Sequence, residues 1–233
     1  LLQLFPKREL VEKYTVCVKK EDVISPQVLA DKLALAGYKR QAMVQDAGDF
    51  AVRGDIVDVC DISGVAYRIN FFDELVENIK VIDVESMLAS NEVQSVNFAP
   101  ASDILLDEKG YEFAREKLSL HPENKNAQQA KELLSVGACD ASSVWALPFL
   151  KSCTQSLFDF FDDDKPTLVI FDEPRVVADK LQILEKEFAG RIKTLCEGAE
   201  ILPEHKDVCI TAHEVKRQLI FLRKMGFASL SLD

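Results

Sequence analysis

The stretch Gly48-Asp49-Phe50-Ala51-Val52-Arg53-Gly54-Asp55-Ile56-Val57-Asp58-Val59 decides the fold of the N-terminal half. Apolar and polar residues alternate on both sides of Gly54, which is typical of two strands that each bury one face and meet at a tight turn. The same alternation returns at residues 67–71 and 79–81, after turns at Ser63-Gly64 and Asp73-Glu74. Residues 38–84 are therefore predicted to form an antiparallel meander.

A short helix is predicted immediately before this meander. Ser25 is a favourable N-cap, Pro26 suits the first helical position, and apolar residues recur at helical spacing until Gly37 ends the pattern. We expect this helix to cover one face of the meander, and a strand at residues 14–18 to complete a small α+β domain. The first domain is predicted to span residues 1–95.

The second domain, residues 96–233, is predicted to be a helical insertion followed by part of an α/β lobe. Residues 107–134 favour two helices, interrupted at His121-Pro122-Glu123-Asn124. The β-branched run 167–171 predicts a buried parallel strand. A helix at 175–188, a strand at 208–211, a helix at 213–225 and a last strand near Ser229 complete a β-α-β-α-β series.

Composition restricts the classes of function. The 233 residues include 39 acidic and 28 basic ones, a formal net charge of -11, so the chain repels a polyanion and nucleic acid is not favoured as a direct partner. No apolar run reaches the roughly 18 to 20 residues that span a bilayer, so no membrane is expected. The six cysteines are scattered without a C-x-x-C pair, which favours reduced thiols in a cytoplasmic protein and no metal site.

Two acidic segments have the residue types of a metal or nucleotide site. Asp172-Glu173 follows a strand, where P-loop ATPases hold magnesium, but the sequence has no G-x-x-x-x-G-K-[ST] phosphate loop, and a turn that begins the next helix is favoured. The acidic run 158–164 lacks the spacing of a calcium loop. Trp145 is expected in a core rather than on a docking surface. We therefore expect no catalytic residue, no cofactor and no metal.

Three arginines are candidates for a protein-binding site. Arg53 and Arg68 alternate with apolar residues, so both are predicted to leave the polar face of the sheet, while Arg40 lies where the chain enters it. Together the guanidinium groups could present one basic surface to the carboxylates of a partner protein. The alternative is that they are ordinary solvated arginines paired with Asp49, Asp55 or Glu74.

Three blocks of sequence carry a family resemblance: residues 37–40 (GYKR), residues 48–59 (GDFAVRGDIVDV) and residues 67–74 (YRINFFDE). In order and spacing they are similar to the domain shared by UvrB and the transcription-repair coupling factor (Mfd), with the pattern G-Y-x-R, G-x-F-x-V-R-G-D-x-x-D-[IV] and R-[IV]-x-F-F-x-[DE]. Later segments, including Leu147-Pro148 and Asp172-Glu173-Pro174, resemble the coupling factor more than UvrB. The resemblance covers most of the chain and weakens after residue 190.

The resemblance implies a docking region of the N-terminal UvrB-like part of such a factor. Its partner would be UvrA, its function the recruitment of UvrA to stalled transcription complexes, and its docking residues Arg40, Phe50, Arg53, Arg68 and Asn70. Two positions depart from the pattern, because Ala51 stands where UvrB often has arginine and Asn70 where an acid is common.

The second domain would be part of a degenerate RecA-like lobe without enzymatic activity. RNA polymerase and DNA would be reached through other modules of a parent DNA translocase. The alternative is a fragment of a UvrB-type helicase that binds DNA and nucleotide.

Overall fold

The predicted meander is a six-stranded sheet with the strand order β3-β4-β5-β6-β7-β8 in a computed structural model. The strands are β3 Lys39–Arg40, β4 Asp49–Arg53, β5 Ile56–Cys60, β6 Ala66–Phe72, β7 Leu75–Ile82 and β8 Ala89–Val93. Neighbours from β4 to β8 are antiparallel, whereas the two-residue β3 runs parallel to β4. The structure describes residues 2–135, 141–161, 167–198, 200–220 and 223–227. The antiparallel meander is thus confirmed.

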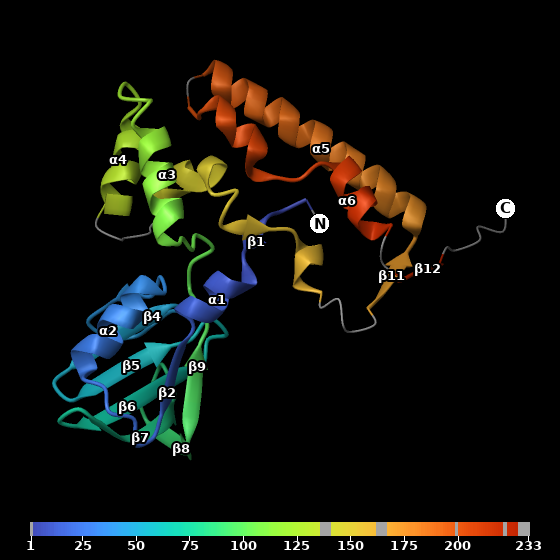
Figure 1. The fold of residues 1–233 in the computed structure, drawn as a ribbon. Coiled ribbons are helices and arrows are strands. Elements are labelled where there is room, and N and C mark those ends of the chain that lie inside the picture. The colour runs from blue at the N-terminus through green and yellow to red at the C-terminus, as the bar shows by residue number, and fades with distance from the viewer. Residues whose placement is uncertain (1, 136–140, 162–166, 199, 221–222, 228–233) are drawn as a thin grey trace.

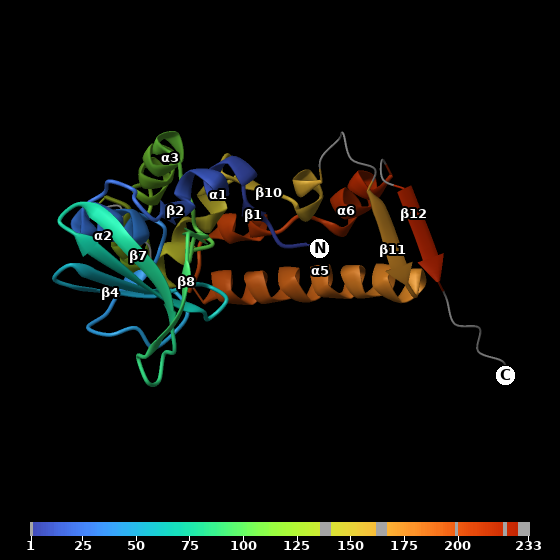
Figure 2. The same ribbon diagram turned by 90° about the horizontal axis from the view of Figure 1, so that it is seen from below.

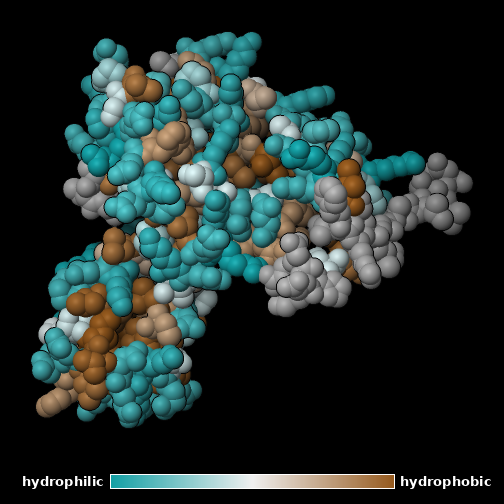
Figure 3. Space-filling view, viewed as in Figure 1, coloured by the Kyte–Doolittle hydropathy of each residue, from teal (hydrophilic) through white to brown (hydrophobic). Residues whose placement is uncertain are grey.

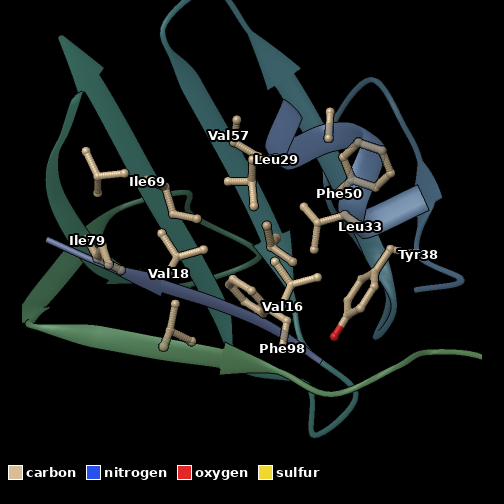
Figure 4. Close-up of a cluster of buried hydrophobic side chains, with 14 of the residues drawn as sticks. Val16, Val18, Leu29, Leu33, Tyr38, Phe50, Val57, Ile69, Ile79 and Phe98 are labelled. Atoms are coloured by element: carbon tan, nitrogen blue, oxygen red, sulfur yellow. The ribbon is translucent and has the colours of Figure 1, made fainter. Parts of the chain in front are cut away.

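Helix α2, Pro26–Leu35, packs on one face of this sheet as predicted. The Ser25 hydroxyl caps it by accepting a hydrogen bond from the Val28 N–H at 3.3 Å. Gly37 ends it with a φ of 89°, and a Cβ at this position would lie 2.5 Å from the Ser102 Cβ. Figure 4 shows Leu29 and Leu33 of α2 turned toward the strand residues of the core. Glycine is therefore required here by both backbone conformation and space.

A second small sheet closes the other side of this core. β2, Val16–Lys19, pairs antiparallel with β9, Ser95–Phe98, and the ring of Phe98 meets Tyr38 and Tyr67 edge to face. After β9 the chain returns to α2, where the Ala101 N–H donates to the Ala36 carbonyl at 2.8 Å. We call residues 16–102 the sheet unit. The division of the chain at residue 95 stays a prediction, but β9 packs with the strands that precede that position.

The first residues of the chain pack with its second half. β1, Phe5–Pro6, pairs with β10, Thr154–Gln155, and Leu10 of α1, Arg8–Tyr14, is buried in a core formed mainly by residues 104–153. We call the described residues outside the sheet unit the helical unit. In Figures 1 and 2 the two units lie side by side, with the sheet unit at one end of the molecule and β11, Leu168–Asp172, and β12, Arg223–Phe227, at the other.

Helices α3, Glu108–Leu118, and α4, Lys125–Ser135, confirm the predicted helical insertion and its break. They pack against the 3-10 helix η1, Ala141–Phe149. Trp145 of η1 packs against this core, as predicted, and its ring meets His205 edge to face at 5.3 Å. His205 belongs to a further 3-10 helix, η3, Pro203–Val208, so η3 is held onto the insertion by this ring contact.

The end of the chain forms a parallel strand pair with helices. β11, Leu168–Asp172, pairs with β12, Arg223–Phe227, while α5, Pro174–Glu197, and α6, Ala212–Leu219, lie between them in sequence. A short 3-10 helix, η2, Leu157–Phe160, precedes β11. Val169 and Phe171 pack against a core that includes Leu181 of α5 and Val215 of α6. An α+β fold with antiparallel sheets and a partial α/β lobe is thus confirmed.

Three predictions in this lobe were wrong or displaced. β11 is not buried, because only one of its faces is covered by helices and Ile170 on the other face is 59% exposed. The expected strand at 208–211 makes a single bridge, between Cys209 and Gln3, because η3 occupies the preceding residues. The expected helix at 213–225 ends at Leu219, since β12 begins at Arg223, and Ser229 lies outside the described residues. Among the described residues, no helix combines the length and the apolar character that crossing a membrane requires.

Candidate protein-docking surface

The sheet face opposite α2 carries Arg53 and Arg68. Side chains alternate between the two faces of a strand, and the core buries Val52 in part and Val57, Ile69 and Phe71 more fully, so the residues between them point away from α2. The cross-strand register places Ala51, Asp58 and Arg68 in one row and Arg53, Ile56 and Asn70 in the next. We call this surface the open face; its exposed or half-buried members include Arg53, Ile56, Arg68, Asn70 and Phe72.

A fully buried carboxylate, Asp58, joins the two arginines. Its oxygens accept hydrogen bonds from Nε of Arg68 at 2.7 Å and from Nη2 of Arg68 at 2.9 Å, and a further one from Nη2 of Arg53. These bonds raise the pKa of Arg68 above its ordinary value, against the opposing effect of burial. The alternative from the sequence, that these are solvated arginines paired with Asp49, Asp55 or Glu74, is therefore wrong for Arg53 and Arg68, because Asp58 bonds both.

This arrangement leaves a fixed, partly exposed pair of guanidinium groups. Two positive charges against one negative charge leave the cluster with a net charge of one, and the Arg53 and Arg68 side chains are 45% and 20% exposed. Arg68 also donates from Nη1 to the Met87 carbonyl at 3.4 Å. A guanidinium group has five N–H donors, so bonds to Asp58 leave donors of Arg53 for a partner carboxylate. Because Asp58 already orients the two guanidinium groups, their side chains lose less rotamer freedom when a partner binds.

Arg40 does not join the other two arginines. In the parallel pair of β3 and β4 it lies opposite Phe50, and residues opposite each other in a ladder share a face of the sheet. Phe50 faces α2, so Arg40 is on that side, and its neighbour Lys39 takes the side of Arg53. Lys39 and Arg40 are adjacent in β3, so their side chains point to opposite faces of the sheet. The prediction that three guanidinium groups share one surface is therefore wrong for Arg40, and Lys39 is the basic residue that the sequence reasoning missed.

Two other predicted docking residues have internal contacts. Phe50 is 1% exposed in the core under α2, so in this fold it supports the sheet and does not contact a partner. Alternation along β4 places Phe50 and Arg53 on opposite faces, so both could not serve one surface. Asn70 is on the open face and is half-buried, with its amide donating to the Asn78 side chain at 2.6 Å.

Phe72 is an exposed aromatic residue that sequence reasoning did not select. It ends β6 beside the Asp73-Glu74 turn, is 75% exposed, and follows Arg68 and Asn70 on the same face, since Ile69 and Phe71 point into the core. Leu75 pairs with it across the hairpin. Aromatic residues beside arginines are enriched where proteins bind each other. The alternation along β6 could have identified this residue. Tyr67, Ile69 and Phe71 face the core, so the next residue, Phe72, must face outward.

Charges alternate along the row that contains Arg68. Lys80 lies directly opposite Arg68, and Glu92 lies opposite Lys80. Like charges at opposed positions repel, and here Asp58 on one side and Glu92 on the other offset the repulsion. The Lys20 ammonium, hydrogen-bonded at 2.9 Å, is the main cause of the lowered pKa of Glu92, with a smaller contribution from Lys80. The basic character of the open face is thus concentrated around Arg53 and Arg68.

The other candidate sites show no arrangement for chemistry. Asp172 is exposed at the end of β11, and Glu173 precedes α5 with a φ of 52°, so these residues form the turn that the sequence favoured. In the acidic run 158–164, Asp159 accepts hydrogen bonds from the Ser156 N–H and hydroxyl at 2.7 Å each, and residues 162–164 lie outside the described part. Within the described ranges, no three His, Cys, Asp or Glu side chains gather as metal ligands would.

Comparison with known proteins agrees with this division of the molecule. Residues 16–103 match the family of the UvrB interaction domain, nearly the same span as the sheet unit. The transcription-repair-coupling factor of Bacillus subtilis is 28% identical over 216 residues, which cover 86% of this chain and 18% of that protein. The factor of Escherichia coli is 27% identical over 168 residues, 69% of this chain and 14% of its own length.

A shorter match is closer in sequence. The transcription-repair-coupling factor of Staphylococcus aureus is 35% identical over 104 residues, 45% of this chain and 9% of that protein. The chain thus spans less than a fifth of the length of these relatives. Residues 16–103 match the UvrB interaction domain family, and the chain as a whole is similar to the transcription-repair-coupling factors of these bacteria.

Proposed function

We propose that this chain is a non-catalytic docking region that recruits a partner of the UvrA/UvrB repair system through the open face of its sheet, and that the partner is UvrA. Its relatives are transcription-repair-coupling factors, so the docking would serve the recruitment of repair proteins to stalled transcription complexes. The fixed pair of guanidinium groups above Asp58, beside the exposed ring of Phe72, is the observation that carries the proposal.

The chemistry of this face fits a protein surface better than a nucleic acid. Arg53 can offer N–H donors to a carboxylate, while Phe72 and the half-buried Ile56 supply apolar area that a phosphate backbone would not use. The chain carries a net charge of -11, which opposes binding of a polyanion. Arginine and an aromatic residue beside each other are also the residue types that contribute most to binding energy at protein interfaces.

The test compares two arginines that differ in their place in the sheet. Arg53→Gln and Arg40→Gln remove the same charge, but only Arg53 is on the open face. We expect Arg53→Gln to weaken UvrA binding about tenfold, since a charged pair at an interface contributes on the order of 1 to a few kcal/mol. Arg40→Gln is expected to change binding less than about twofold. Isothermal titration calorimetry with purified UvrA measures both dissociation constants.

A second pair of variants tests the apolar part. Phe72→Asp places a charge at the tip of the β6–β7 hairpin without touching Asp58, whereas Val28→Asp places one on the outer surface of α2, across the sheet. Phe72→Asp is expected to abolish measurable binding and Val28→Asp to leave it intact. Equal binding by Phe72→Asp and the unmodified chain, or equal losses for Arg40→Gln and Arg53→Gln, would remove the open face as the docking surface.

A further inference from the structure

A groove in the helical unit lies where three segments far apart in the sequence meet. Its walls come from α3, from the end of η1 with the following residues, and from η3, and its volume is about 700 Å³. Apolar side chains line its floor, among them Phe113, Pro148 and Phe149, with Lys109, Lys117 and Lys151 around them. Figure 3 shows hydrophobic residues among hydrophilic ones over the part of the molecule where Figure 1 labels α3 and α4.

Helix α3 is apolar on two sides, and only one of them is used by the core. Ala114 and Leu118 are fully buried against α4 and η1. Phe113 is nevertheless 46% exposed, and Leu120, just beyond the helix end, is 66% exposed; both line the groove. Exposed apolar side chains gathered in a concave surface commonly mark a site where another molecule docks.

Three lysines outnumber two carboxylates, Glu204 and Asp207, in the lining of this groove, although the chain as a whole is acidic. Lys109, Phe113 and Lys117 follow at intervals of four residues, so they form one stripe along α3, and the Lys117 ammonium lies 5.3 Å from the centre of the Phe113 ring. Within the described residues neither Lys109 nor Lys117 takes part in an ion pair. Lys151 is paired with Asp207 at 3.3 Å. Two unpaired cations thus flank an exposed aromatic ring in a chain with a net charge of -11.

We propose that this α3 groove docks an acidic peptide segment of a partner protein. Two apolar side chains of the peptide lie on Phe113 and Leu120, and its carboxylates meet Lys109 and Lys117. An open groove suits a peptide, since a small ligand is usually buried in its pocket and oriented there by a few polar groups. Glu204 and Asp207 line the same groove and oppose the dense negative charge of a nucleic acid more than the few carboxylates of a peptide. The site is in the helical unit and is separate from the open face.

The first experiment identifies peptides that bind the groove. A display library of random 12-residue peptides is panned on the full chain, with counter-selection on the Phe113→Asp variant. Enriched peptides are expected to carry two apolar residues three or four positions apart and a net negative charge. Enrichment of basic peptides, or of no peptide that distinguishes the chain from Phe113→Asp, would overturn the proposal.

The second experiment measures the most enriched peptide by fluorescence anisotropy. Phe113→Asp and Leu120→Asp are each expected to weaken its binding at least about tenfold, as loss of a central apolar contact does. Lys117→Glu should weaken it less and reduce its dependence on salt. Ile183→Asp, which introduces the same charge at an exposed apolar position of α5, is the control and should bind as the unmodified chain does.

Two checks keep the result interpretable. Because Phe113 and Leu120 are both exposed, at least one of their variants is expected to keep the thermal midpoint of the unmodified chain, and that variant is the one compared. Phe72→Asp on the open face should leave peptide binding unchanged, so that failure of the groove and failure of UvrA docking are separate outcomes. Equal binding of the peptide to a folded Leu120→Asp variant and to the unmodified chain would overturn the proposal.

Discussion

The sheet unit and the lobe around β11 each cover one face of their strands, but they bury that face to different degrees. The six-stranded sheet has α2 and the β2–β9 pair over its core face, and a residue such as Val57 or Ile69 is completely buried. β11 has helices on one face only, and its residues alternate between exposed and half-buried. In β11 the burial of the side chains alternates although the residues from Leu168 to Phe171 are all apolar. An apolar run therefore does not by itself show that both faces of a strand are buried.

Substitution of one apolar strand residue in each unit gives the largest expected difference. Phe50→Ala removes a fully buried ring from the sheet unit and is expected to lower the free energy of unfolding by about 3 to 5 kcal/mol. Ile170→Ala on the exposed face of β11 should change it by no more than about 0.5 kcal/mol. Urea denaturation followed by circular dichroism measures both changes in the free energy of unfolding. Hydrogen exchange assigns each change to its unit. A loss above 2 kcal/mol for Ile170→Ala would show that this face packs against something.

The buried carboxylate of the sheet unit gives the next largest effect. Asp58→Ala leaves the guanidinium groups of Arg53 and Arg68 without their shared acceptor and is expected to cost about 1 to 3 kcal/mol. Asp55→Ala, in the exposed turn between β4 and β5, is the control and should cost less than about 0.5 kcal/mol. In a double-mutant cycle with Arg68→Ala, additive losses would mean that the Asp58–Arg68 pair contributes nothing of its own.

Helix caps allow the same change to be made in each unit. Ser25→Ala removes the cap of α2, and Thr211→Ala removes the cap of α6, where the Thr211 hydroxyl and the Glu214 carboxylate bond each other's backbone N–H groups. Losses of about 1 kcal/mol are expected, larger for Thr211 because its hydroxyl both accepts from the Glu214 N–H and donates to the Glu214 carboxylate. Amide exchange at the first turn of each helix measures the loss. A larger loss at Ser25 would contradict this ranking.

The smallest effect is a pH dependence confined to the helical unit. Burial lowers the pKa of His205 below its ordinary value of 6.5. Between the folded and the unfolded pKa, the unfolded chain holds more protons, so stability is complete above pH 6.5 and falls as the pH drops toward the folded value. All three histidines lie outside the sheet unit. Thermal unfolding from pH 7.5 to 5.5 should therefore shift only the helical unit, and His205→Gln should reduce the shift.

Much of the fold was predictable because local patterns set it. Period-two alternation placed the meander, the Ser25-Pro26 cap and Gly37 bounded α2, and the residues 121–124 separated α3 from α4. The lobe near β11 was predicted less well, because the stretch 208–211 has strand-like composition but lies between η3 and α6. In the part of the chain that the structure describes it makes one bridge, between Cys209 and Gln3. Propensity does not show which neighbour is available.

The candidate site was predictable in part for the same reason. Alternation by itself determined that Arg53 and Arg68 share the face opposite α2 and that Phe50 does not. Only the tertiary structure decided that Asp58 bonds both arginines, that Arg40 takes the other face, and that Phe113 remains exposed over a groove. The direction of a side chain follows from the local period of the backbone, whereas its partner depends on strand register and on segments that are distant in sequence.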